Sequence, residues 1–530
     1  MSESFPRAWS SLLSARGYAE HPDRVSLIET HISWVLLAGR FAFKIKRPVR
    51  LAFIDQSSLA RREWLCREEL RLNRRFAPEL YLGVVPITFQ HGEARIGGEG
   101  AAIEYAVCMR RFDASQQLDW LLAHGGIQPN ELAAFGRRLA QLHARLPAAG
   151  CGNPWGHGDA QRELVLRNFD ETCAAAAALG GPDELEGLRP SLMAKLDATR
   201  RCLEIRRSEQ RVRECHGDLH ARNIARIDGR LTPFDCLEFA DALRWIDVAD
   251  EVALLLVDLE SRGCALHAYA YWSAWLEVSG DYGSLRVLDL YKAHRALVRA
   301  KVAALNLHGG LSEPEQRTLR KEHQALIAAA GRALSVRSGW LVMLSGLSGS
   351  GKSWLAQRLA PALGLVHLRS DLERKRLAGP DSLGHSGSDP GRGLYAPATT
   401  AAVYDHLALS TEAILGGGYG VIVDATFLRF EQRQRFAAIG AQFGAGSLLL
   451  LCHSEPEVLR QRLLRRQREA TDPSEADARV LEWQLRQREP ISPNEHPRPI
   501  EIDTQRADAV GFALAQLRHS GLTASPPAAS

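Results

Sequence analysis

A short glycine-rich stretch in the second half of the chain constrains the fold more than any other feature of the sequence. It reads GLSGSGKS over residues 346–353 and fits the spacing G-x-x-x-x-G-K-[ST]. An apolar run precedes it at 340–345, and a helical pattern follows at 352–360. Strand, glycine loop and helix in this order predict a phosphate-binding loop, because backbone N–H groups free of Cβ clashes curve around phosphate at a helix N-terminus.

The polar side chains of this loop have separate predicted roles. Lys352 is expected to reach the β- and γ-phosphates of ATP, and the Ser353 hydroxyl is expected to bind Mg²⁺. The remaining nucleotide-binding residues predicted here are Gly346, Ser348, Gly349, Ser350 and Gly351.

Strand-like and helical patterns alternate around the loop. The strand-like runs are 340–345, 365–369, 421–425, 447–452 and 499–503. Alternation of this kind predicts a parallel α/β sheet with crossover helices. Asp371 and Asp424 lie at the ends of the second and third runs, where such sheets bind ligands. We expect Asp371 to accept a hydroxyl proton and Asp424 to hold Mg²⁺ through water; the alternative for each is a helix N-cap.

Two further segments are candidates for closing over this site. Arg462 and Arg466 are four residues apart and share a helix face, which predicts contact with the transferring phosphoryl group. The alternative is a solvated basic face. Residues 379–400 are rich in Gly, Ser and Pro and are expected to form a mobile flap over the acceptor.

The second half resembles the small P-loop kinases: the gluconate and shikimate kinase group, the zeta-toxin group and phage polynucleotide kinase. The specific likeness is the D-x-x-R of Asp371 and Arg374. The resemblance implies that Asp371 is the catalytic base and that Arg374 contacts a substrate phosphate or the transition state. It covers about 339–510.

A second phosphoryl-transfer pattern lies in the first half. Residues 216–223 read HGDLHARN, so Asp218 and Asn223 have the spacing D-x-x-x-x-N, and Asp235 follows twelve residues later. Transfer of the protein-kinase kind needs these groups in this order. Asp218 is predicted to orient the attacking hydroxyl, and Asn223 and Asp235 are predicted to hold Mg²⁺. Asp247 and Asp250 are expected to brace this loop.

This pattern requires an upstream lysine and a glutamate on the next helix. Residues 31–50 predict a hairpin that turns at 38–40, and Lys44 lies inside its second strand. Lys46 is the alternative, nearer the strand exit. In the predicted helix 57–76, Glu69 shares a face with apolar residues and therefore needs a cationic partner. Glu68 is the alternative.

The first half resembles the aminoglycoside phosphotransferase and choline kinase superfamily, over about 25–330. The resemblance implies a bilobal protein-kinase-like fold in which Asp218 is the base and Lys44 contacts the α- and β-phosphates. The hairpin departs from the protein-kinase pattern, since it offers Gly39 alone in place of G-x-G-x-x-G. The predicted domains are 1–335 (N-lobe 25–112, C-lobe 113–335), 339–510, and a tail at 511–530.

The amino-acid composition limits the classes of partner that the chain is expected to bind. The 530 residues carry 66 Lys and Arg against 62 Asp and Glu, a net charge of +4. This balance disfavours nucleic acid as a partner, without excluding it for the C-terminal half. No apolar run approaches 18 residues, and the N-terminus lacks a basic region before an apolar core, so a cytoplasmic protein is expected.

The order of the two halves is similar to a bacterial fusion described as bifunctional aminoglycoside phosphotransferase/ATP-binding protein. The resulting hypothesis is a multidomain α/β and α+β kinase with two ATP–Mg²⁺ sites and small-molecule hydroxyl acceptors. The alternatives are a nucleic-acid end kinase in the C-terminal half, and a nucleotide-sensing regulator in which one site binds without turnover.

Overall fold

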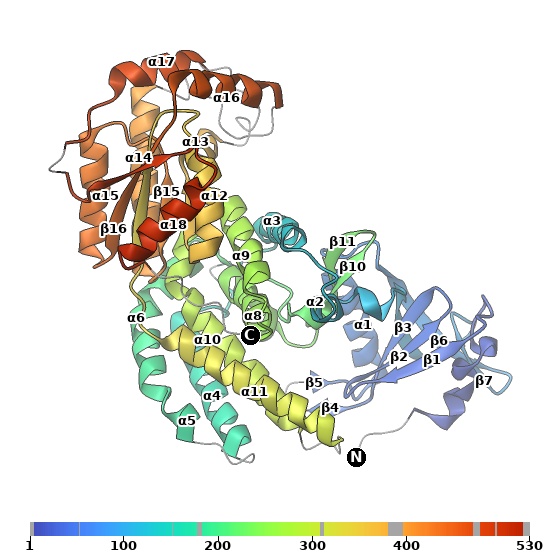
Figure 1. Ribbon diagram of the computed structural model, residues 1–530. Coiled ribbons are helices and arrows are strands. Elements are labelled where there is room, and N and C mark those ends of the chain that lie inside the picture. The colour runs from blue at the N-terminus through green and yellow to red at the C-terminus, as the bar shows by residue number, and fades with distance from the viewer. Residues whose placement is uncertain are drawn as a thin grey trace. The chain divides into compact units, whose positions relative to one another are not determined.

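In the computed structural model, the chain divides into two units (Figure 1). The structure describes residues 5–51, 54–150, 152–177, 183–307, 312–379, 396–469, 478–492 and 495–522. The N-terminal unit comprises residues 1–165 and 203–259, and the C-terminal unit comprises 166–202 and 260–530. Among the described helices, none combines the length and the apolar character needed to cross a membrane.

A six-stranded antiparallel sheet opens the N-terminal unit, in the order β1-β2-β3-β8-β6-β7. Its strands are β1 Val25–Glu29, β2 Ser33–Ala38, β3 Phe41–Lys46, β6 Tyr81–Gln90, β7 Glu93–Ile96 and β8 Ala102–Arg110. The short strands β4 Arg50–Leu51 and β5 Ile54–Asp55 pair separately. The predicted hairpin is confirmed, with Gly39 at φ 55° in its turn.

Helix α1, Leu59–Asn73, packs on this sheet and confirms the predicted helix 57–76. Ser58 caps it by accepting a hydrogen bond from the backbone N–H of Arg61. Its buried face contains Leu65, Leu72 and the carboxylate of Glu69. The helix therefore carries a charged group into the apolar space beside β8.

The rest of the N-terminal unit is mainly helical and contains the HGDLHARN loop. Its elements are η1 Arg7–Leu13, η2 Ala15–Gly17, η3 Ala114–Gln116, α2 Leu118–Ala123, α3 Pro129–Arg145, β9 Val212–Glu214, η4 Ala221–Asn223, β10 Ile224–Ile227, β11 Arg230–Pro233, α7 Asp241–Arg244, β12 Trp245–Asp247 and α8 Val248–Ser261. The loop runs from β9 to β10, and the β10–β11 hairpin ends just before Asp235.

A five-stranded, fully parallel sheet is the centre of the C-terminal unit, in the order β14-β15-β13-β16-β17. Its strands are β13 Trp340–Ser345, β14 Val366–Arg369, β15 Val421–Asp424, β16 Gly446–His453 and β17 Pro499–Asp503. The near-continuous apolar sequences of β13, β15 and β16 fit a sheet that is covered on both faces. All five strands were predicted, with bounds within one residue.

Helices cover both faces of this sheet. In Figure 1, α12 Lys352–Leu363 and α18 Ala509–His519 lie on one face, and α14 Pro397–Gly416 and α15 Phe430–Gln442 lie on the other. The unit also contains α4 Gly158–Ala177, α5 Asp183–Glu186, α6 Arg189–Ser208, α9 Ala265–Ser279, η5 Tyr282–Ser284, α10 Leu285–Asn306, α11 Glu313–Leu334, α13 Ser370–Ala378, α16 Pro456–Glu469 and α17 Ala478–Gln487. Helices α4 and α6 begin or end in the other unit.

The C-terminal tail requires a correction. It was predicted to start at 511, but α18 continues to His519 because Ala509, Ala513 and Leu517 pack into the core beside α12. Residues 380–395 of the predicted flap lie outside the described residues, and Pro397 begins α14. The domain limits near 335–339 stay a prediction; the C-terminal unit includes 260–334.

Candidate active sites

The glycine-rich loop connects the end of β13 to the start of α12. Gly346, Gly349 and Gly351 have φ values of 144°, 82° and 85°. A Cβ atom at Gly346 would lie 2.3 Å from the carbonyl oxygen of Cys452, and one at Gly351 would lie 2.9 Å from the hydroxyl of Thr504. The loop therefore needs glycine for both its backbone conformation and its close packing.

Lys352 lies against the inside of this loop. Its Nζ donates hydrogen bonds to the carbonyl oxygens of Gly346 and Leu347, both at 2.9 Å. Burial lowers the pKa of Lys352 below its ordinary value, while the nearby carboxylate of Asp424 opposes that shift. The ammonium group is thus held among loop carbonyls, next to the space that the loop encloses.

Asp424 ends β15 and lies next to the loop. Its Oδ2 is 3.2 Å from His367 Nε2, and its carboxylate is hydrogen-bonded to Ser353. Burial raises the pKa of Asp424, but the hydrogen bonds from His367 and Ser353 and the charge of Lys352 lower it more, so the net shift is downward. The site therefore contains an ionised carboxylate beside a hydroxyl.

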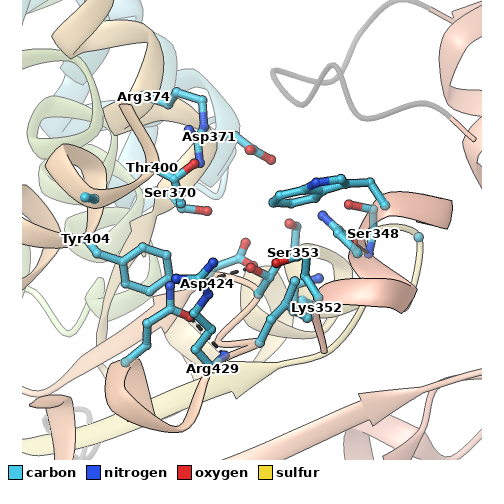
Figure 2. Close-up of a pocket in the computed structure, with 18 of the residues that line it drawn as sticks. Ser348, Lys352, Ser353, Ser370, Asp371, Arg374, Thr400, Tyr404, Asp424 and Arg429 are labelled. Atoms are coloured by element: carbon cyan, nitrogen blue, oxygen red, sulfur yellow. Dashed lines mark hydrogen bonds between the residues drawn. The ribbon is translucent and has the colours of Figure 1, made fainter. Parts of the chain in front are cut away.

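A cavity of about 450 Å³ opens over the loop. Figure 2 shows Asp371 and Arg374 on one side of it and Ser348, Lys352 and Ser353 on the other, with Asp424 between them. The predicted residues that line it are Ser348, Gly349, Gly351, Lys352, Ser353, Asp371, Arg374, Asp424, Arg462 and Arg466. Gly346 and Ser350 belong to the same loop but are not among the lining residues of the cavity.

Arg462 has contacts that the sequence did not predict. Its Nη1 donates to the carbonyl oxygen of Gly349 at 3.3 Å and to Thr504 Oγ1 at 2.9 Å. Thr504 Oγ1 in turn donates to the carbonyl oxygen of Ser350 at 2.9 Å. Gln484 Oε1 accepts a hydrogen bond from the Ser348 N–H at 2.8 Å. Arg462 thus lines the cavity and also bonds the backbone of the loop. No local sequence motif predicts the contacts of Thr504 and Gln484 with the loop.

The second candidate site lies in the N-terminal unit, where β3 faces α1. Lys44 Nζ donates to Glu69 Oε1 at 3.0 Å and also contacts Asp235. The predicted lysine, glutamate and metal-binding aspartate are therefore brought together. Lys46 lies in the same network, since it contacts Glu69 Oε2 at 2.6 Å and pairs with Glu238.

Burial and charge act against each other in this network. Burial raises the pKa of Glu69, but the two lysines lower it more, to about 2. Burial lowers the pKa of Lys44, but Asp235 and Glu69 raise it well above its ordinary value. Lys44 and Glu69 therefore form a charged pair, in which each charge offsets the cost of burying the other.

The HGDLHARN loop brings Asp218 and Asn223 into contact. Asn223 Nδ2 donates to Asp218 Oδ2 and to the Asp218 carbonyl oxygen, each at 3.0 Å. Asp235 has a positive φ of 66° and its N–H donates to the Tyr81 hydroxyl at 3.0 Å. A strained backbone held by a buried side chain is typical of functional positions.

Two acidic residues that the sequence analysis missed support this loop. Glu251 Oε2 accepts from the N–H groups of His216 and Gly217 at 2.7 and 2.9 Å. Asp258 Oδ2 accepts from the N–H of Ala221 at 2.8 Å. Asp247, which is expected in this role together with Asp250, forms a buried pair with Arg206, at 2.6 and 2.7 Å, and the bracing role of both stays a prediction.

The two lysines are expected to differ in what their loss costs. Lys46→Met leaves Glu238 buried without its partner, so it should lower the free energy of unfolding by about 3–5 kcal/mol. Lys44→Met should cost less, since Glu69 keeps Lys46 and Asp235 is 44% exposed. The difference in the free energy of unfolding is measured by unfolding each variant in urea and monitoring hydrogen exchange of peptides from β3. Equal losses would contradict the account.

Known proteins resemble the chain in each part. Residues 341–491 match the family described as an AAA domain. The curated "Uncharacterized protein Rv2004c" of Mycobacterium tuberculosis (strain H37Rv) is 29% identical over 445 residues, which cover 83% of this chain and 86% of the relative.

Solved structures with similar folds include two kinases. An aminoglycoside phosphotransferase from Alicyclobacillus acidocaldarius is 15% identical, with a TM-score of 0.36, and covers 63% of this chain and 97% of that chain. A sugar kinase from Janibacter sp. HTCC2649 is 20% identical, with a TM-score of 0.28, and covers 35% and 98%.

The predicted combination of a unit built on an antiparallel sheet and a unit built on a parallel sheet with a phosphate loop is confirmed. The family match covers the phosphate loop, and the strand order and loop geometry agree with it. In the N-terminal unit, the antiparallel sheet, the Lys44–Glu69 pair and the Asp218–Asn223 loop have the predicted arrangement.

Proposed function

We propose that the protein is an ATP- and Mg²⁺-dependent phosphotransferase with two separate sites, each acting on the hydroxyl group of a small molecule. The observation that supports this best is the cavity of the C-terminal unit. One space is lined by phosphate-loop residues and by Asp371, on the opposite side. A nucleotide and an acceptor therefore have room to meet there.

The polar groups of both sites fit a magnesium nucleotide. The Ser353 hydroxyl and the Asp424 carboxylate are hard oxygen ligands, already in contact with each other. In the N-terminal unit, the Asn223 amide and the Asp235 carboxylate would take the same role. Bound Mg²⁺ would withdraw negative charge from the phosphate oxygens during transfer.

At the C-terminal site, each residue has a separate role in phosphoryl transfer. Lys352 exchanges its loop carbonyls for phosphate oxygens, and the loop N–H groups hold the β-phosphate. Asp371 accepts the proton of the acceptor hydroxyl as its oxygen bonds to the γ-phosphorus, and the bond from phosphorus to the bridging oxygen of ADP breaks. Arg374 and Arg466 offset the charge of the transferring group.

At the N-terminal site, Asp218 takes the corresponding proton. Lys44 holds the α- and β-phosphates, and Glu69 fixes the position of Lys44.

Both reactions take place in the cytoplasm in this proposal. Reduced cysteines such as the buried Cys66 and Cys215 persist in that compartment.

Asp371→Asn tests the C-terminal assignment. Because Asp371 is proposed to touch the acceptor alone, the variant should bind a nonhydrolysable ATP analogue as the wild type does. Acceptor phosphorylation should fall by about 10²-fold, the scale of general-base catalysis. The acceptor is found by screening pooled hydroxy compounds with radiolabelled ATP.

The screen should use the full chain, with one site silenced at a time. Residues 260–334 pack in the same unit as the phosphate loop, so cutting the chain near 335 would damage that unit. Asp218→Asn silences the N-terminal site, and Lys352→Ala silences the C-terminal one.

Loss of analogue binding in Asp371→Asn would make Asp371 a metal or folding residue and contradict the proposed role.

A further inference from the structure

Helix α13 presents two functional faces. Asp371 and Arg374 line the cavity, whereas Glu373 is fully buried on another side of the same helix. Residues two apart on a helix point in nearly opposite directions, so contacts at Glu373 fix the helix without entering the cavity.

Glu373 is the centre of a buried hydrogen-bond cluster. Its Oε1 accepts from the Tyr282 hydroxyl at 2.9 Å, and its Oε2 is 2.9 Å from His406 Nε2. Arg376 Nε donates to the same Oε2 at 2.8 Å. Burial raises the pKa of Glu373, but these donors lower it more, so the carboxylate is ionised and fully bonded.

Arg376 extends this cluster to the end of another helix. Its Nη1 and Nη2 donate to the carbonyl oxygens of Val278 and Glu277, at 3.0 and 2.7 Å, in the last turn of α9. A cation there offsets the partial negative charge of a helix C-terminus. Gly280 leaves room for the guanidinium, since a Cβ at that position would lie 2.6 Å from its Cζ.

The partners of Glu373 come from different parts of the sequence. Tyr282 belongs to the region predicted as the C-lobe of the first kinase fold, as do the α9 carbonyl oxygens that bind Arg376, whereas His406 belongs to α14 beside the phosphate-loop sheet. All of them lie in the C-terminal unit. The helix that carries the acceptor-side residues is therefore held by a segment outside the P-loop domain.

We propose that Glu373, held by Tyr282 and Arg376, is a positioning residue that sets the orientation of α13 and so places Asp371 and Arg374 for acceptor phosphorylation. This proposal rests on the proposed function of the C-terminal site. In this proposal, the α9–η5 segment contributes to the function of that site through its contacts with α13. Neither Glu373 nor Tyr282 lines the cavity.

The structure offers a matched pair of tyrosines for the test. Tyr282 donates to Glu373 on α13, and Tyr269 of α9 donates to the carbonyl oxygen of Leu365 at 3.0 Å, just before β14. Each Tyr→Phe change removes one hydroxyl that joins the helical segment to the P-loop domain. Only the first removes a contact to α13.

Hydrogen exchange of the full chain, with a nonhydrolysable ATP analogue and Mg²⁺, provides the first measurement. Tyr282→Phe should speed exchange in peptides covering 370–378 about tenfold, the scale of one hydrogen bond to a charged group. Exchange in α12 and the affinity for the analogue should stay within about twofold of the wild type. Tyr269→Phe should leave 370–378 unchanged. Equal effects of the two variants on these peptides would overturn the proposal.

Acceptor phosphorylation provides the second measurement, with the acceptor found in the screen. Tyr282→Phe should lower kcat/KM for the acceptor about tenfold without raising KM for ATP. In a background that carries both Asp371→Asn and Arg374→Ala, the same change should have almost no further effect, because it acts through these two residues. A full additional loss in that background would overturn the positioning role. If the wild type phosphorylates no acceptor, the proposed function fails, and the exchange contrast still decides whether Tyr282 and Glu373 position α13.

Discussion

Lys352→Ala is expected to abolish phosphoryl transfer at the C-terminal site. The ammonium group is buried inside the phosphate loop, and no other lysine lines the cavity among the described residues. Removing a preorganised charge from a transferring group costs at least about 10²–10³-fold in rate. Binding of a nonhydrolysable ATP analogue at this site should be lost as well, since Lys352 is proposed to contact the β- and γ-phosphates. Calorimetry and ADP release, both in an Asp218→Asn background, measure the two effects.

Lys321→Ala is the matched control for this variant. Lys321 lies exposed on α11, so its replacement removes the same charge away from the cavity. It should bind the analogue and release ADP as the parent does. Undiminished nucleotide binding in Lys352→Ala would show that the loop does not hold phosphate in the proposed way.

Asp218→Asn is expected to lower phosphoryl transfer at the N-terminal site by about 10²-fold or more, the scale of general-base catalysis. The substitution keeps the size of the side chain and the contact with Asn223. Nucleotide affinity should therefore change little. Steady-state rates and analogue titrations in a Lys352→Ala background separate these two quantities.

Asp228→Asn controls for the loss of a carboxylate in the same unit. Asp228 forms an exposed pair with Arg110, and such pairs contribute little to stability. This variant should keep wild-type turnover. Turnover in Asp218→Asn equal to that of the Asp228 control would remove Asp218 as the base.

The features that could be predicted from the sequence are the local ones. The phosphate loop, the Asp218–Asn223 spacing and the alternation of strands and helices each depend on residues close together in the chain. The choice of Glu69 over Glu68 also followed from a local pattern, because a helix face is set by a repeat of 3.6 residues. In the structure Glu68 instead pairs with Arg71 and Arg244.

The features that could not be predicted depend on distant contacts. Lys46 was placed near the strand exit, yet it is 1% exposed, because Glu238 reaches it from 192 residues away. Thr504 and Gln484 meet the phosphate loop from 154 and 136 residues away. The partners of Glu373 belong to this class too, since Tyr282 is 91 residues from it. Spacing along the chain carries no information about such pairs.

The number of nucleotide sites tests the central claim most directly. Calorimetric titration of the full chain with a nonhydrolysable ATP analogue and Mg²⁺ should saturate near two analogues per chain, because each unit has its own set of residues proposed to bind phosphate. The same titration of Lys352→Ala should saturate near one. A stoichiometry of one for the intact, active wild-type protein would contradict the account of two ATP sites.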